Sequence, residues 1–148
     1  MDVALWVGHS VSVTGHQAAE ELIEFEFDEV ERDMLWRGLL EWSGPARCTD
    51  ELAVAMGYPD VNQMFVEQQR LKDAIKSEQP LSRFDWVRVV LGTEIVFASS
   101  LVGGGGDWSI MSGMSDELSI ATLRSIQKKV TRELRGLIRD GFGTRAAS

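Results

Sequence analysis

The sequence predicts an all-α fold, a compact bundle of five or six helices, and three observations support this prediction. Apolar residues recur at helical spacing in several segments of the 148-residue chain. Residues that cap helices precede these segments, and glycine or proline follows them. The alternation of apolar and polar residues that is typical of strands appears in residues 23–27 and, in one interpretation, in residues 87–91. The length fits a single domain, residues 1–148, of which we expect residues 1–16 and 141–148 to be poorly ordered.

Residues 23–27 form the first predicted element, a short extended segment. Its apolar residues alternate with acids, so one face is expected to be buried. Asp28 follows with Glu31 three residues later, the spacing of a capping box, and predicts a helix that runs to about Trp42. Glycine and proline at positions 44 and 45 end this helix.

Two further helices are predicted between residues 50 and 77. A short one covers residues 50–56, with Thr49 as its N-cap and Gly57 as its stop. The next begins after Asp60 and runs to about Ser77, with its apolar residues on one side. Pro80 then separates it from the next element.

Residues 83–102 allow two interpretations. Ser82 and Asp85 have the spacing of a capping box, and the following residues are almost entirely apolar, as in a buried helix. The alternative is a β-hairpin with Gly92 and Thr93 as its two-residue turn. We favour the helix, because the cap is good and because Leu101 and Val102 extend the apolar pattern.

The last helix is the most clearly marked. Ser115 is its predicted N-cap, acids occupy its first turn, and an apolar face continues to Leu137. Its other face carries a basic stripe: Arg124, Lys128, Arg132, Arg135 and Arg139. We expect this stripe to be solvated, or to pair with acids of residues 20–33, rather than to bind nucleic acid, because no aromatic residue interleaves it.

The formal net charge of −8 is concentrated near the N-terminus. Residues 1–33 contain nine acidic residues and one basic residue, whereas residues 34–148 contain fourteen of each. We therefore expect a local acidic patch, which we define as Glu20, Glu21, Glu24 and Glu26. Such a patch is suited to a protein partner of opposite charge.

A Gly-rich loop, GGGGDWS at residues 103–109, precedes the last helix. Phosphate-binding loops lead into a helix N-terminus and usually supply a lysine. Here the run leads into Asp107, and no basic residue lies between Arg88 and Arg124, so phosphate binding is disfavoured. A hinge, a lid or a plain connector remain as interpretations, with Trp108 holding the loop to the core.

Known catalytic and metal-binding motifs are absent from the sequence. It contains no HExxH, no Gly-x-Ser-x-Gly and no Gly-Lys-Ser/Thr, and its histidines, His9 and His16, lie in a weakly patterned region. The single cysteine, Cys48, favours a reducing compartment. We expect no cofactor, no metal, no enzymatic activity and a cytoplasmic location. Asp2 argues against a secretory signal, and residues 86–102 are too short and too charged to span a membrane.

Three residues are candidates for contact with a ligand or partner. Glu94 falls on an otherwise apolar helix face, so it needs either a structural hydrogen bond or a functional partner. Asp107 and Trp108 follow the glycines. Trp6 and Trp108 are the tryptophans outside regular helices, and are the better candidates for an exposed aromatic surface.

Residues 49–69 resemble a helix-turn-helix unit, in which the second helix reads DNA. In that alternative, Asn62, Gln63 and Gln69 would contact bases. Pro59 follows the turn glycine unusually closely, and Glu67 would face phosphates.

The leading hypothesis is a small, acidic, non-enzymatic interaction or regulatory domain, such as an adaptor, inhibitor or immunity-type antagonist. It would bind a protein partner through the acidic patch and exposed aromatic residues, and a homo-oligomer is also possible. DNA binding through residues 49–69 is the first alternative. A small-molecule pocket or enzyme site near the Gly-rich loop is the second.

Overall fold

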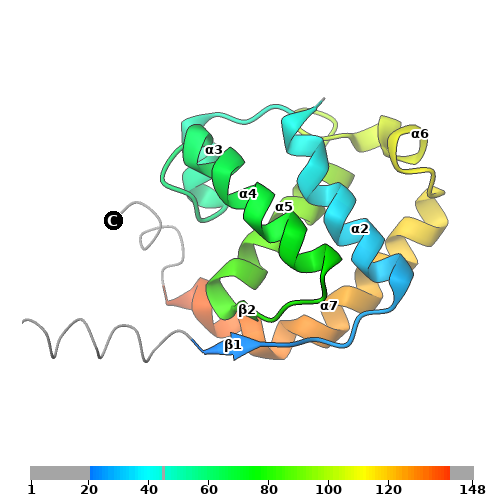
Figure 1. Ribbon diagram of the computed structural model, residues 1–148. Helices are drawn as coiled ribbons and strands as arrows, with labels where there is room; N and C mark the ends of the chain where they lie inside the picture. Colours follow the sequence, from blue (N-terminus) through cyan, green and yellow to red (C-terminus); the bar gives the residue numbers. More distant parts are fainter. Residues whose placement is uncertain (1–20, 45, 141–148) are drawn as a thin grey trace, which may run out of the picture.

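The computed structural model describes residues 21–44 and 46–140. Trp6, Glu20 and the two terminal segments expected to be poorly ordered lie outside this range. The described part contains six α-helices and one two-stranded sheet, which confirms the all-α prediction (Figure 1). The helices are α2 (Glu29–Leu40), α3 (Asp50–Ala55), α4 (Val61–Lys76), α5 (Arg83–Ala98), α6 (Trp108–Ser112) and α7 (Asp116–Arg139). The 3-10 turns η1 (Glu41–Ser43) and η2 (Gly105–Asp107) and the strands β1 (Leu22–Ile23) and β2 (Leu81–Ser82) complete the list.

Helix α5 forms the centre of the bundle and settles the choice between helix and hairpin. It packs against α2 and α7, while α4 packs against α2. In Figure 1, α5 passes behind α2 and α4. Most of its residues are buried, as expected of an almost entirely apolar helix.

The end of α5 differs from the prediction. The helix stops at Ala98 rather than near Val102, and Leu101 is 91% exposed. Ser99 adopts an extended conformation, and its hydroxyl accepts hydrogen bonds from the backbone N–H groups of Leu101 and Val102 at 3.2 Å each. This local turn competes with the helix, so the two apolar residues do not continue it.

The polar residues near the start of α5 form a buried ion-pair network. Arg88 is only 8% exposed and donates to Asp85 Oδ1 at 3.1 Å and to the carbonyl of Gly57 at 2.8 Å. Its guanidinium lies 4.2 Å from the centroid of the Phe84 ring. The network therefore connects α5 to the turn between α3 and α4, and satisfies a charge that would be costly to bury alone.

The extended segment before α2 shows the predicted alternation. Phe27 is buried and Phe25 partly buried, whereas Glu24 and Glu26 are exposed. Both rings contact the Trp86 indole edge-on, with centroid distances of 5.2 and 5.6 Å. Ile23 pairs with Leu81 in the two-stranded sheet. The segment is thus held against α5 by side chains more than by sheet pairing.

The Gly-rich loop folds back on the end of α5. Gly104 N–H donates to Val96 O at 2.7 Å, and Gly105 has a positive φ of 45°. A Cβ on Gly103 would lie 2.6 Å from two backbone carbonyl oxygens of α5, so only glycine fits there. The segment then forms η2 and α6, helical turns that the sequence did not indicate.

Candidate functional site

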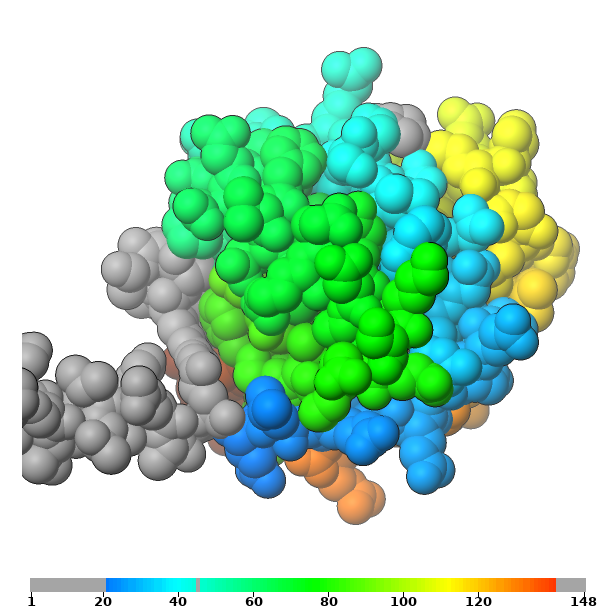
Figure 2. Space-filling view, in the orientation of Figure 1, coloured from blue at the N-terminus to red at the C-terminus, as the bar shows by residue number. Residues whose placement is uncertain are grey.

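A groove lies between the extended segment, the first half of α2 and the C-terminal end of α4. It consists of an inner cavity of about 180 Å³, beside Trp86, and an outer hollow of about 360 Å³, beside Trp36. Arg32 and Ile75 line both parts, so the two adjoin. Figure 2 shows this face, where blue residues from the beginning of the described chain meet the green end of α4. We call the whole surface the acidic groove.

Acidic residues outnumber basic ones along this groove. Five acidic residues and two basic residues line it. The acids are Glu24, Glu26, Glu29, Asp33 and Glu78, and the cations are Arg32 and Lys76. Arg32 is already engaged, because its Nη1 donates to Phe27 O at 2.5 Å and pairs with Glu78 at 2.9 Å. The surface offered to a partner is therefore negative.

Glu78 lies just after the end of α4, at a position in the helix ending that is unusual for a glutamate. The N–H of Gln79 donates to Ala74 O at 2.9 Å, and the N–H of Glu78 donates to Ile75 O at 3.3 Å, the two bonds of a Schellman motif. The residue at the Glu78 position of this motif is usually glycine, because its φ is positive. Glu78 has φ 56° and is the only non-glycine residue of the described part with a positive φ. A carboxylate thus occupies a backbone position that normally lacks a side chain.

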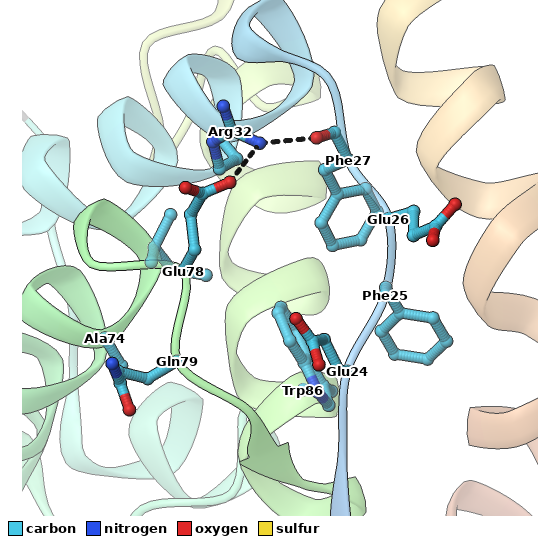
Figure 3. Close-up of a pocket in the computed structure, with 10 residues that line it drawn as sticks. Glu24, Phe25, Glu26, Phe27, Arg32, Ala74, Glu78, Gln79 and Trp86 are labelled. Carbon is cyan, nitrogen blue, oxygen red and sulfur yellow. Dashed lines mark hydrogen bonds and ion pairs between the residues drawn. The ribbon is translucent and has the colours of Figure 1, made fainter.

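The side chains of the extended segment point to two sides. In Figure 3, the carboxylate of Glu24 lies in front of the Trp86 indole, facing the space bounded by Glu78 and Gln79. The ring of Phe25 and the carboxylate of Glu26 point the other way, away from Ala74. The indole N–H of Trp86 donates to Ile23 O at 2.8 Å, so the ring itself forms the cavity wall while its polar atom is satisfied.

The predicted acidic patch is only partly brought to this groove. Glu21, Glu24 and Glu26 are exposed. Glu24 faces the inner cavity, while the backbone carbonyl of Glu26 accepts a hydrogen bond from Lys129 of α7 at 2.9 Å. Glu78 and Trp36 complete the groove, and sequence reasoning did not select either as a site residue. Nothing in the sequence marks Glu78, because its approach to Arg32 depends on how α4 packs against α2.

Glu94, Asp107 and Trp108 have separate surroundings. Glu94 is half-buried and accepts a hydrogen bond from the Gln127 amide at 2.7 Å, which satisfies it structurally. Asp107 is exposed. Trp108 is fully buried, and its indole N–H donates to the Ser119 hydroxyl at 2.8 Å. Trp108 is therefore a core anchor that holds the Gly-rich loop, as expected, and it is not available as an exposed aromatic.

The residues of the DNA-binding alternative lie on α4 and are exposed. Asn62 and Gln63 occupy its first turn, and the Gln69 amide donates to Asp73 at 3.2 Å. Arg70, on the same helix, is held by Asp85 at 2.9 Å and by Glu67 at 2.5 Å. The hydrogen bonds to these two carboxylates raise the pKa of its guanidinium. Its charge is therefore balanced within the protein.

The basic stripe on α7 is exposed along its whole length. The residue of α7 that pairs with the N-terminal acids lies beside this stripe. Lys129 donates to the buried Glu31 carboxylate at 2.6 Å, and the Ser125 hydroxyl donates to the same group at 2.5 Å. Among the described residues, the side-chain ion pair between the two regions is thus that of Lys129 with the buried Glu31, rather than a matching of two surfaces.

Comparisons with known proteins give no relative for this chain: no protein-family model, no curated protein and no solved structure matches it. In the described part of the chain, no group of three or more His, Cys, Asp or Glu side chains is arranged to hold a metal ion. No helix in that part is both long and apolar enough to cross a membrane. Burial raises the pKa of the Cys48 thiol to about 11, with a further contribution from Asp50.

Proposed function

We propose that this chain is a protein-interaction domain that binds a basic surface of a protein partner in the acidic groove. The observation that carries the proposal is the groove itself, in which four carboxylates, those of all its acidic residues except Glu26, lie around the half-buried Trp36 and the wall formed by Trp86. Aromatic residues supply contact area at protein interfaces, and opposite charges speed encounter and fix the register of the two partners.

The role that fits this surface is that of an adaptor, inhibitor or antagonist rather than an enzyme. A carboxylate-lined groove with one engaged arginine is complementary to lysine and arginine side chains of another protein. Cys48, as the one cysteine of the sequence, fits a reducing compartment, and we propose the cytoplasm.

Site-specific photo-crosslinking in a lysate of the native host tests this proposal. A photoreactive amino acid replaces Trp36 in the groove, and the matched control carries it at Ala121, an exposed position on α7. We expect a crosslinked protein from position 36 only, and weaker crosslinking when Asp33 and Glu29 are both changed to the amides. Equal products from both positions, or products unaffected by the amide changes, would exclude the groove as the binding surface.

DNA binding through α3 and α4 remains the second candidate, with less support. The exposed amides of Asn62 and Gln63 favour it, but Asp60, the N-cap of the same helix, would meet phosphates. A shift assay at low salt with mixed-sequence duplexes tests it, and a chain that retards no duplex does not bind DNA this way.

A further inference from the structure

The inner cavity of the acidic groove has the size of a single side chain. Its volume of about 180 Å³ is close to that of an engineered cavity of about 150 Å³ that holds benzene. Pockets for cofactors and drug-sized ligands are larger, roughly 300–1,000 Å³. The cavity therefore fits one side chain inserted by a partner rather than a whole small-molecule ligand.

The walls of the cavity favour a long aliphatic chain. Phe27, Ile75 and Trp86 are each less than a tenth exposed and form its apolar lining. The indole N–H of Trp86 is already bonded to Ile23 O, so this ring presents carbon atoms and π-electrons to the cavity. A methylene chain packs against such walls, and a cation is attracted to an aromatic ring.

The polar groups at the mouth favour a positive charge at the end of that chain. Glu24 and Glu78 stand on two sides of the opening, on the extended segment and after α4 respectively (Figure 3). Glu24 has no ion pair among the described residues, and Glu78 has only the exposed pair with Arg32. Of the described residues that line this opening, Arg32 is the one cation, and it is bonded to both Phe27 O and Glu78, and so does not neutralise Glu24.

We propose that the inner cavity takes one lysine or arginine side chain of the protein partner. Its methylene groups lie against Ile75 and Trp86, and its charge lies between Glu24 and Glu78. This inference rests on the proposed function, because it assigns a specific contact within the same groove. It also accounts for a glutamate at the Schellman position, where a glycine would supply no second carboxylate.

A titration with two small probes tests the inference without the partner. N-acetyl-lysine N-methylamide supplies the cationic side chain, and N-acetyl-norleucine N-methylamide supplies the same chain without the amine. We expect the lysine probe to shift the Trp86 indole signal and the amide signals of residues 74–79 in a two-dimensional NMR spectrum, and to saturate at millimolar concentration. The norleucine probe should bind at least about fivefold more weakly, because it lacks the charge.

Amide variants of the two glutamates test where the lysine probe binds. Changing Glu24 and Glu78 together to glutamine should weaken binding of the lysine probe by about tenfold, since two charge contacts are lost. Glu117→Gln is the matched control, because Glu117 is exposed on α7 outside the groove, and it should leave the affinity unchanged. Equal affinity of the two probes, no shift at all, or an equal loss in the control would overturn the inference.

The failure of the side-chain assignment can be distinguished from the failure of the proposed function. A partner crosslinked at position 36 together with no binding of the lysine probe would remove the side-chain assignment and keep the proposed function. Specific binding of the probe without any crosslinked partner would remove the proposed function and keep the cavity as a cation site.

Discussion

The backbone of Glu78 adopts a left-handed conformation, which is strained for a residue with a side chain. A left-handed conformation costs an L-residue about 1–2 kcal/mol, and glycine avoids this cost but loses more conformational entropy on folding. We expect Glu78→Gly to be more stable than Glu78→Gln, with a free energy of unfolding that is about 0.5–1 kcal/mol higher. Urea unfolding of the two variants measures this difference. Both variants lose the ion pair with Arg32, so the difference reports the backbone alone. Equal stabilities would show that the conformation is not strained.

Glu41, directly after α2, makes stability depend on pH. It is 7% exposed, and this burial raises the pKa of its carboxyl, although Arg37 nearby partly offsets the effect. The protonated form therefore favours the fold, and that contribution disappears as the pH rises through the raised pKa. We expect Glu41→Gln to be more stable than the parent chain at about pH 7, by about 1 kcal/mol or less, and equally stable at about pH 4. Urea unfolding at both pH values measures this, and a destabilised variant at neutral pH would contradict it.

Between elements, Glu31 links the start of α2 to α7. It completes the capping box with Asp28 and accepts hydrogen bonds from Ser125 and Lys129. Burial by itself would raise the pKa of Glu31, but these bonds outweigh it and lower the pKa. Its contribution to stability is present above the ordinary carboxyl pKa and is lost as the pH falls through the lowered one.

Replacing Glu31 by glutamine should therefore lower the free energy of unfolding by about 1–3 kcal/mol at about pH 7. The reason is that the buried hydrogen bonds from Ser125 and Lys129 lose their charged acceptor. The difference from the parent chain should shrink in acid. Glu29→Gln, in the same first turn but exposed, is the control and should change stability little. A similar loss in both variants would mean that the general acidity of this turn matters, and not the link to α7.

The crossing of α2 and α5 depends on a glycine. A Cβ added at Gly38 would overlap the Thr93 side chain. We expect Gly38→Ala to lower the unfolding free energy by about 1–3 kcal/mol, and Thr93→Ala to restore part of it in the double variant. Gly136→Ala, in α7 where nothing lies within 4 Å, should instead stabilise by up to about 1 kcal/mol. No recovery in the double variant would show that the helices are separated by another contact.

The beginnings of the helices could be predicted because their signals are local. Asp28, Asp60 and Ser115 cap α2, α4 and α7, and each accepts the expected backbone hydrogen bond. The end of α5 could not be predicted, because the apolar pattern continues past Ser99, whereas the Ser99 hydroxyl stabilises a turn in place of the helix. Acidic residues near the N-terminus indicated a negative surface. The cavity beside them was not foreseeable, because its other wall comes from residues about fifty positions further along the chain.

At the scale of the molecule, the single-domain organisation remains a prediction that unfolding can test. Three of the four tryptophans in the described part lie in different regions: Trp42 beside α5, Trp86 beside the extended segment, and Trp108 against α7. A single cooperative unit should therefore give coincident urea transitions by tryptophan fluorescence and by far-ultraviolet circular dichroism. Two separated transitions would show that part of the bundle unfolds independently.

The last of the four glycines offers a place to attach a reporter dye. A side chain at Gly106 would meet nothing within 4 Å, whereas Gly103 is closed in by the backbone of α5. A cysteine introduced at position 106 would be exposed, and the half-buried Cys48, with its pKa raised to about 11, would remain largely protonated and slow to react with maleimide. The natural sequence therefore permits selective labelling of this loop without removing its own cysteine, and leaves the acidic groove unmodified for binding measurements.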